Sequence, residues 1–323
     1  MPAGVVLSSL DSRDVLDFLF DRVNTAEELS WAMSLGLRVP SDRAIEEYAS
    51  LGHSAGLREW LGDRQINTHT PYSYTLRNKL YESTIGIGVL DKRRDKPGLA
   101  SVRISEHAER AASHWEELLT PIVENGADAT ALCIDGTPFY GSTHVVGGTA
   151  TGNTNDLSVT QVPALNVGTA TAPTATELSD AFAGVLAYQY GYRDEGGKPN
   201  NQGGKQFAVM FPLSWGSAPY NAIGNQYLAN GVSNNLFGVI QQQGVTITPM
   251  VNPRMSATTI FHFFRMDSAM KPFILQDEIA LTTSALAEGS EEEFKNFRHL
   301  YGLHASRAVG YGRWQSASKC TLS

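Results

Sequence analysis

Hydrophobic and polar positions recur with a helical period over residues 101–125. The apolar positions are spaced by three and four residues along about seven turns, and they are Ile104, Ala108, Ala111, Trp115, Leu118 and Ile122. The other face is charged, so the pattern predicts one helix of about 37 Å, a strut with a sheet along it. Pro121 removes a hydrogen bond inside a helix, which predicts a kink there or an end near Leu119. If the helix continues, Gly126 is the expected stop.

The first fifty residues carry a second helical pattern. Its apolar residues share one face, and they are Val15, Leu16, Phe18, Leu19 and Val23. A second helix is expected to begin at Thr25, because Thr25 and Glu28 have the spacing of a capping box. Pro40 interrupts the run, and a short helix is predicted over residues 45–52.

Between residues 60 and 90 the period changes to the alternation that is typical of strands. Tyr72, Tyr74 and Leu76 alternate with polar residues, which predicts a long β-hairpin that ends in the basic segment 91–96. A two-stranded hairpin alone is marginal in water. We therefore expect it either to fold back on its own domain or to reach another subunit. The basic segment is then either a solvated turn or an inter-subunit charge contact.

The rest of the chain mixes strands and helices without a regular βαβ order, which favours the α+β fold class. Strands are predicted over residues 129–134, 207–211, 244–250, 260–264, 272–276 and 297–315. Helices are predicted over residues 176–190 and 221–228, the first capped by Thr174 or Thr176. Residues 147–173 are rich in Gly, Thr, Asn and Ala, so we predict a long surface loop or extended arm there.

Length and charge limit the function classes. The 323 residues suggest about two domains, and the net charge of −8 argues against a general nucleic-acid clamp. Asp11, Asp14 and Asp17 stand where a signal peptide needs basic residues, and there is no apolar run of about 18 residues. We expect a soluble protein made in the cytoplasm, with Cys133 and Cys320 as reduced, buried thiols.

Candidate chemistry is sparse. Dinucleotide-binding, P-loop, HExxH and GxSxG motifs are absent from the sequence. His107 and His114 share a face of the predicted helix, and we interpret them as satisfied or solvated histidines. Cys133, Asp135 and His144 have the residue types of a thiol nucleophile with its partners. Nearness in sequence does not establish that geometry, so a hydrolase is the least favoured reading.

Two acidic segments, residues 194–195 and 291–293, could bind a cation weakly, but solvated loops are the favoured interpretation. The sequence therefore predicts no catalytic, cofactor-binding or metal-ligating residues and no cofactor. The scarcity of such residues favours a structural role.

Four stretches of the chain resemble, in order, the Mu-like phage major head subunit (gpT) family. They are residues 57–64, residues 78–87, the pattern Asp135-Gly136…Phe139-Tyr140…His144, and the closing pattern Tyr301-Gly302…Gly310-Tyr311-Gly312…Trp314-Gln315. The resemblance runs from about Tyr48 to the end of the chain, and residues 1–44 lie outside it.

The resemblance implies the Hong Kong 97-type capsid fold and the function of a major capsid protein of a tailed phage. It implies four parts, which are an N-terminal arm (1–57), an extended E-loop hairpin (58–98), a peripheral domain with a spine helix (99–127 plus 256–296), and an axial domain with returning strands (128–255 plus 297–323). The E-loop would lie over the neighbouring subunit. The implied contact residues are Arg64, Asn67, His69, Tyr72, Lys92, Arg93, Arg94 and Lys96.

The implied partner is the chain itself, in hexamers and pentamers of an icosahedral virion shell, with decoration, scaffold and portal proteins as further candidates. Double-stranded DNA would be enclosed without sequence specificity, which suits a negatively charged wall, and no membrane is expected. Synthesis is expected in the cytoplasm of a host bacterium. The alternatives are an encapsulin-type shell around a protein cargo and, less favoured, a Cys/His hydrolase.

Overall fold

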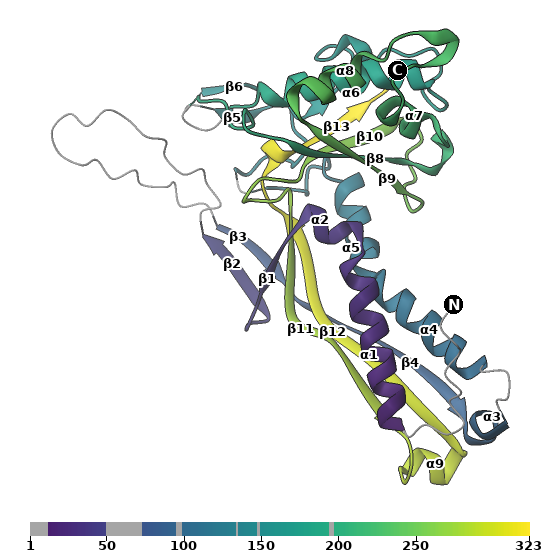
Figure 1. Ribbon diagram of the computed structural model, residues 1–323. Helices are drawn as coiled ribbons and strands as arrows, with labels where there is room; N and C mark the ends of the chain where they lie inside the picture. The colour runs from purple at the N-terminus through teal and green to yellow at the C-terminus, as the bar shows by residue number, and fades with distance from the viewer. Residues whose placement is uncertain (1–11, 50–72, 95–98, 134, 147–148, 194–196) are drawn as a thin grey trace.

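Two β-sheets, one in each half of an elongated molecule, organise the fold (Figure 1). The computed structural model describes residues 12–49, 73–94, 99–133, 135–146, 149–193 and 197–323. Over these residues helices and strands are mixed without a regular βαβ order, which confirms the predicted α+β class. Among the helices described, none is long and apolar enough to cross a lipid bilayer.

The lower half is built on a four-stranded sheet in the order β1–β11–β12–β4. Its strands are β1 (Gly36–Pro40), β4 (Lys79–Gly88), β11 (Phe273–Leu286) and β12 (Arg298–Tyr311). β11 and β12 form a long antiparallel hairpin, β4 pairs antiparallel with β12, and β1 runs parallel to β11. The pairing of β11 with β12 shifts register on both sides of Ile279.

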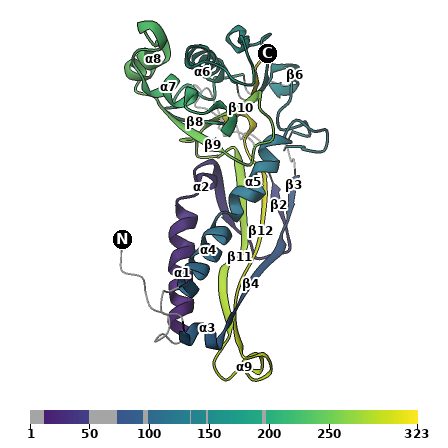
Figure 2. The ribbon, with the colours of Figure 1, turned by 90° about the vertical axis from the view of Figure 1, so that its right-hand side faces the viewer.

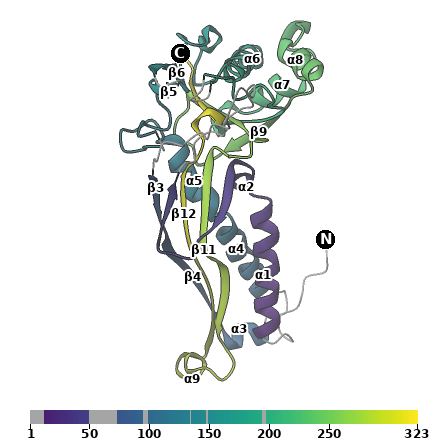
Figure 3. The same ribbon diagram turned by 90° about the vertical axis from the view of Figure 1, so that its left-hand side faces the viewer.

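Helices α1 (Ser12–Glu28) and α4 (Leu99–Ala112) cover one face of this sheet (Figure 2). The buried side chains between them are Val15, Leu19, Val23, Ile87, Ile104, Ala108, Tyr301 and Leu303. The apolar stripes predicted from spacing on both helices therefore face the sheet. A two-stranded hairpin, β2 (Ile45–Ala49) and β3 (Ser73–Arg77), lies on the other side of the sheet (Figure 3).

The strut predicted over residues 101–125 is present as two helices, α4 and α5 (His114–Glu124), which are separated at Ser113. Pro121 lies inside α5 and does not end it, so the predicted end near Leu119 is wrong. The reason is that Pro121 is exposed. On that face water can hydrogen-bond the carbonyl that the missing N–H leaves without a helical partner.

The upper half is built on a five-stranded sheet in the order β7–β13–β10–β8–β9. Its strands are β7 (Asp156–Leu157), β8 (Gln206–Pro212), β9 (Thr246–Asn252), β10 (Ile260–Arg265) and β13 (Ala317–Thr321). Its helices are α6 (Ala175–Tyr190), α7 (Ala218–Gly224) and α8 (Asn235–Gln243). The core between them combines Leu and Val side chains with a group of aromatic ones, among them Phe182, Phe207, Phe211, Phe261 and Phe263.

A third cluster of buried residues joins the two halves. It packs α5 and the short helix α2 (Trp31–Leu35) against the adjoining ends of the two sheets, and it includes Trp115, Leu119, Phe139, Tyr140, Phe264, Phe273, Tyr311 and Trp314. The rings of Phe139 and Tyr311 stack with centroids 4.7 Å apart. Because large aromatic side chains bury the most apolar surface, we expect this junction to hold the two halves together.

The strand pairing differs from the domain division expected from the resemblance. β10 belongs to the five-stranded upper sheet, although residues 256–296 were predicted with the spine helix. β12 belongs to the four-stranded lower sheet, although residues 297–323 were predicted with the axial domain. The chain crosses between the halves after β10 and again after β12, and local sequence patterns do not report which sheet a strand joins.

Two predictions in the first fifty residues are wrong. α1 continues through Thr25, whose hydroxyl donates to the Asp21 carbonyl within the helix instead of capping a new one. The next helix is α2, capped by Ser30. Residues 45–49 form strand β2 rather than a helix, because they pair with β3 along their whole length. Periodicity alone does not separate such short apolar runs.

The later elements agree with most predictions. The predicted strands at 207–211, 244–250, 260–264, 272–276 and 297–315 and the helix at 176–190 are confirmed, with Thr174 and Glu177 in a capping box. The predicted strand at 129–134 is wrong, since Leu132 makes only an isolated bridge to Pro138 in a bent loop. The predicted arm 147–173 contains strand β6 (Thr149–Asn153), which pairs with β5 (His144–Val146) just before it, and strand β7. The helix at 221–228 is instead α7, and α8 was not predicted.

Candidate inter-subunit contact surfaces

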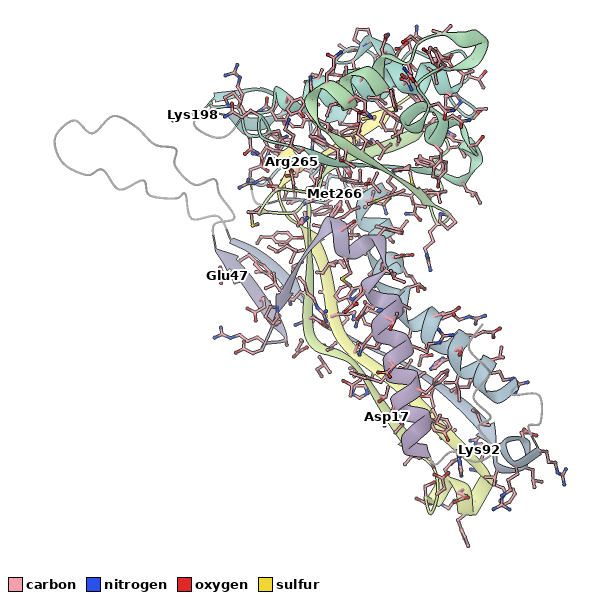
Figure 4. The ribbon with its side chains drawn as sticks, in the orientation of Figure 1. Asp17, Glu47, Lys92, Lys198, Arg265 and Met266 are labelled. Atoms are coloured by element: carbon pink, nitrogen blue, oxygen red, sulfur yellow. The ribbon has the colours of Figure 1, made fainter. Side chains whose placement is uncertain are left out.

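The predicted E-loop contact residues fall into two groups. Those outside the described residues are Arg64, Asn67, His69, Tyr72 and Lys96. The others, Lys92, Arg93 and Arg94, lie in helix α3 (Val89–Arg94), which follows β4. Figure 4 places Lys92 at the lower end of the molecule, far from Glu47 of β2. The described parts of the predicted hairpin 58–98 therefore belong to two separate features, the β2–β3 hairpin and the lower end of the long sheet.

The β2–β3 hairpin is attached to the lower sheet by few side chains. The Tyr48 hydroxyl donates to Gln276 Oε1 at 2.7 Å, and the Tyr311 N–H donates to the Tyr74 hydroxyl at 3.1 Å. Burial, with Glu46 and Tyr74 nearby, raises the pKa of Tyr48 to about 12, so this hydroxyl remains a donor.

The same hairpin depends on a close approach at Gly310 of β12. A Cβ at Gly310 would lie 2.5 Å from a methyl carbon of Leu76, which is buried against this position. On the other face Ile45 is 53% exposed and Glu47, Thr75 and Arg77 are also exposed. The hairpin thus presents one face packed on the sheet and one face of exposed side chains that is available for contact with another chain.

The lower end of the molecule carries a second surface, which we call the lower tip. It consists of α3 and the turn between β11 and β12 with helix α9 (Glu291–Asn296). Lys92 Nζ lies 3.0 Å from Glu288 Oε1, so this predicted contact residue pairs within its own chain. Arg93 and Arg94 are exposed. Phe294 is 92% exposed, and such exposure of a large aromatic side chain is typical of an interaction site when other apolar side chains lie nearby.

The exposed apolar residues nearest to Phe294 in the lower tip are Phe297 and Leu286, which are 52% and 56% exposed. None of the three was predicted as a contact residue, although Phe294 follows three glutamates, where an apolar side chain has no local partner. The acidic segment 291–293 is the first turn of α9, not a loop, and Arg298 pairs with Glu292 there. Residues 194–195, the other acidic segment, lie outside the described residues.

The upper half carries a third surface, which we call the upper patch. It gathers exposed apolar side chains around α7 and the turn after it, namely Leu213, Tyr220, Tyr227 and Val232. Their exposure ranges from 44% to 65%. These residues were not predicted as contact residues either.

The structure brings Cys133, Asp135 and His144 together. The Cys133 thiol donates to Asp135 Oδ1 at 2.9 Å, and His144 Nδ1 lies 2.7 Å from Asp135 Oδ2. The Thr137 hydroxyl donates to Asp135 Oδ1 at 2.6 Å and lies 2.9 Å from His144 Nδ1. The turn between them needs Gly136, whose φ of +75° is left-handed. Both Cys133 and Cys320 are free and buried, as predicted.

This geometry does not support a thiol nucleophile. Burial and the neighbouring Asp135 raise the pKa of the Cys133 thiol far above its ordinary value, whereas a nucleophilic cysteine needs a lowered pKa. The thiol is hydrogen-bonded to the carboxylate rather than to an imidazole base. Burial alone would raise the pKa of Asp135, but the hydrogen bond and charge of His144, with the Cys133 and Thr137 donors, lower it to about 2.

His107 and His114 line a cavity of about 320 Å³ between the strut helices and strands β4 and β12. Burial lowers the pKa of both, with Arg110 adding to the effect at His107 and Arg307 at His114. The ring of His114 packs edge-on against Tyr81, with centroids 4.4 Å apart. Both histidines are part of the packing of the strut, but His107 Nε2 is buried without a hydrogen-bond partner, so His107 is not the satisfied or solvated histidine that was predicted.

Comparison with solved structures defines the class of protein. A chain in the procapsid of bacteriophage JBD30 matches with a TM-score of 0.55 and 19% sequence identity, over 97% of this chain and 75% of that chain. In this chain the strut helices lie on a long sheet, and a second sheet covered by helices lies above it. This arrangement is the Hong Kong 97-type fold of phage capsid proteins.

A family model described as Mu-like prophage major head subunit gpT matches residues 16–170 and 235–323, and the chain belongs to this family. The Mu-like prophage FluMu major head subunit of Haemophilus influenzae is 32% identical over 124 residues, which cover 38% of this chain and 39% of that protein. The major capsid protein of Escherichia phage Mu is 30% identical over 112 residues, 35% and 36% of the two chains. The chain thus matches less than half the length of these relatives, and the resemblance predicted from motifs is confirmed.

Proposed function

We propose that this chain is the major capsid protein of a tailed phage and has no enzymatic role. Copies would assemble into hexamers and pentamers of an icosahedral shell that encloses double-stranded DNA. The observation that carries the proposal is membership of the gpT family over residues 16–170 and 235–323, together with the matching fold. The virion is then its location, after synthesis in the host cytoplasm.

The surface of the subunit supports assembly from identical copies. Apolar side chains are exposed at the lower tip and at the upper patch, which lie at opposite ends of the elongated molecule, and the β2–β3 hairpin has an open face. Contacts between different surfaces of identical copies are heterologous, and they close into rings when the rotation angle allows. We propose that the half built on the four-stranded sheet is the peripheral domain of such a subunit and the half built on the five-stranded sheet its axial domain, with the arm and the E-loop drawn from residues 1–98.

Electron microscopy of the full chain after expression tests this function. Rings, sheets or closed shells are the expected result, because a subunit of this class is completed by its neighbours. A monodisperse monomer at every concentration and salt condition would contradict the proposal.

The content of the particles separates the two shell functions. Negative charge on the wall allows enclosed DNA to move, since a cationic wall would hold it by counterion release. We propose packaged DNA, with scaffold, decoration and portal proteins as partners. Nuclease-protected DNA in particles from phage-producing cells would support this, whereas a consistent protein cargo without DNA would favour the encapsulin-type alternative.

Phe294→Ser tests the lower tip as a contact between copies. The folded subunit should keep its stability within about 0.5 kcal/mol, because an exposed side chain contributes little to folding. Assembly should weaken by about tenfold or more in the concentration required, since burying a Phe side chain contributes roughly 1.5–3 kcal/mol.

Light scattering against protein concentration measures the effect. Leu29→Ser is the matched control, since Leu29 is 82% exposed but lies between α1 and α2, away from the tip. Equal assembly of the Phe294 variant and the parent chain would rule out a contact at this residue.

A further inference from the structure

The cluster of Cys133, Asp135 and His144 has no part in the proposed assembly, but its geometry is specific. The orientation of His144 is set by Asn155. The Asn155 Nδ2 group lies within hydrogen-bond distance of three main-chain carbonyls, at 2.7, 3.3 and 3.2 Å, and these belong to Phe139, Trp314 and Ala317. Its Oδ1 accepts the Gly141 N–H at 2.9 Å. These bonds determine which end of the amide faces His144.

Asn155 Oδ1 lies 3.2 Å from His144 Nε2. Because an amide oxygen only accepts, Nε2 must carry the proton in this contact. A neutral His144 then has its lone pair on Nδ1, which faces the Asp135 carboxylate at 2.7 Å. Two acceptors at this distance require a cation between them, and the cation is either a proton or a metal ion.

We propose that Cys133, Asp135 and His144 form a site for a divalent transition metal of the zinc class. Their sulfur, oxygen and nitrogen ligand atoms all lie within 4.8 Å of one another. Zinc takes these three donor types and leaves a fourth position, which the Thr137 hydroxyl or a water can fill. The prediction of no metal ligands from the sequence rested on the missing spacing motif, and the fold supplies the proximity instead.

The surroundings of the site have the features of a metal centre. The other nitrogen of a metal-bound histidine usually donates to an oxygen acceptor, and Asn155 Oδ1 provides it. The His144 ring is fully buried and stacks on Trp314, with centroids 4.0 Å apart and planes 7° apart. The Asp135 side chain is 14% exposed, which gives the ion a way in.

Charge and size also fit the ion. A Cys133 thiolate and an Asp135 carboxylate balance two positive charges, and the thiol proton and the proton shared with His144 leave to solvent. Tetrahedral zinc ligands lie about 3.4 Å apart, against 2.9 Å from Cys133 Sγ to Asp135 Oδ1 here. The carboxylate would move outward by about half an ångström, which its partly exposed turn permits. The ion would cross-link Cys133, where the loop before β5 begins, to His144, where it ends.

Cobalt(II) titration of the full chain, stripped of metal with a chelator, tests the proposal. Co²⁺ replaces zinc in such sites and gives a thiolate-to-cobalt charge-transfer band in the near ultraviolet. We expect a band that saturates at one Co²⁺ per chain and disappears when Zn²⁺ is added. Cys133→Ser should abolish the band, and Asp135→Asn should weaken Co²⁺ binding by about tenfold or more.

Cys320→Ser is the matched control, because Cys320 is also a free, buried thiol but lies in β13. It should keep the band. Thermal unfolding of the parent chain gives a measurement without variants, in which Zn²⁺ raises Tm and Mg²⁺ does not. The absence of a band in the parent chain, its persistence in Cys133→Ser, or its loss in Cys320→Ser would overturn the proposal. The proposed capsid function would be unaffected by any of these results.

Discussion

Arg307→Ala is expected to destabilise the unassembled subunit by about 3–5 kcal/mol, the cost of removing one partner from a buried ion pair. Arg307 of β12 is fully buried. Its Nη1 lies 3.0 Å from Glu27 Oε1 of α1, and its guanidinium lies over the Trp115 ring at 4.2 Å. Asp277 of β11 lies within 3.9 Å of its Nε. Without Arg307, the buried Glu27 carboxylate loses its paired cation and Asp277 keeps only Arg38, so urea unfolding should show the cost of an unpaired buried charge.

Arg38→Ala is the matched control for this variant. Arg38 pairs with the same Asp277 at 2.5 Å, but its side chain is 51% exposed. Exposed ion pairs contribute about 0–1 kcal/mol to the free energy of unfolding, so Arg38→Ala should change that free energy little. The double variant Glu27→Gln with Arg307→Met should recover part of the loss, because it removes charge on both sides. Similar losses for Arg38→Ala and Arg307→Ala would show that burial does not govern this network.

Acid is expected to destabilise the subunit through His262, the second large effect. His262 of β10 is buried, and its ring stacks with Phe264 and lies against Tyr140. Burial, with Lys319 across the strand pair, lowers its pKa from 6.5 to about 3. At a pH between these two values, His262 therefore binds a proton in the unfolded chain but not in the folded chain. The stability that depends on neutral His262 is fully present above pH 6.5 and is lost as the pH falls toward 3.

At pH 4.5 this loss amounts to roughly 3 kcal/mol, at 1.36 kcal/mol per pH unit. His262→Phe keeps an aromatic ring in an aromatic environment and removes the titrating group. Urea unfolding at pH 7.5 and 4.5 should show a smaller difference between the two pH values for the variant, by about that amount. His107 and His114 contribute acid sensitivity of the same sign, so some dependence on pH should remain. The same pH dependence in parent and variant would exclude His262 as the main cause.

The elements that could be predicted from sequence are those in which local pattern and tertiary environment agree. Strands β8 and β10 are short, largely apolar runs rich in Phe, and they are central strands of the upper sheet. The stripe on α4 is buried where the spacing placed it. The break at Ser113 could not be predicted, because its sequence carries no breaker, and Pro121 misled because its exposure depends on the whole fold.

The candidate sites show the same division. Cys133, Asp135 and His144 could be named from residue type, but Thr137 and Asn155, which orient them, are ordinary polar residues in sequence. Residues 129–134 are apolar enough for a strand. The contacts of Asp135 with His144 across the following loop bend the backbone instead.

The register shifts around Ile279 have a consequence for curvature. A bulge makes a strand bend and twist more sharply than regular pairing does. β11 carries its irregularity midway along its length, just below Asp277 and the aromatic junction. The closed shell that we propose would need the same subunit at different tilts around its corners and flat faces. We expect the β11–β12 hairpin to bend by different amounts at Ile279 in subunits with different tilts, while the packing above and below Ile279 stays unchanged.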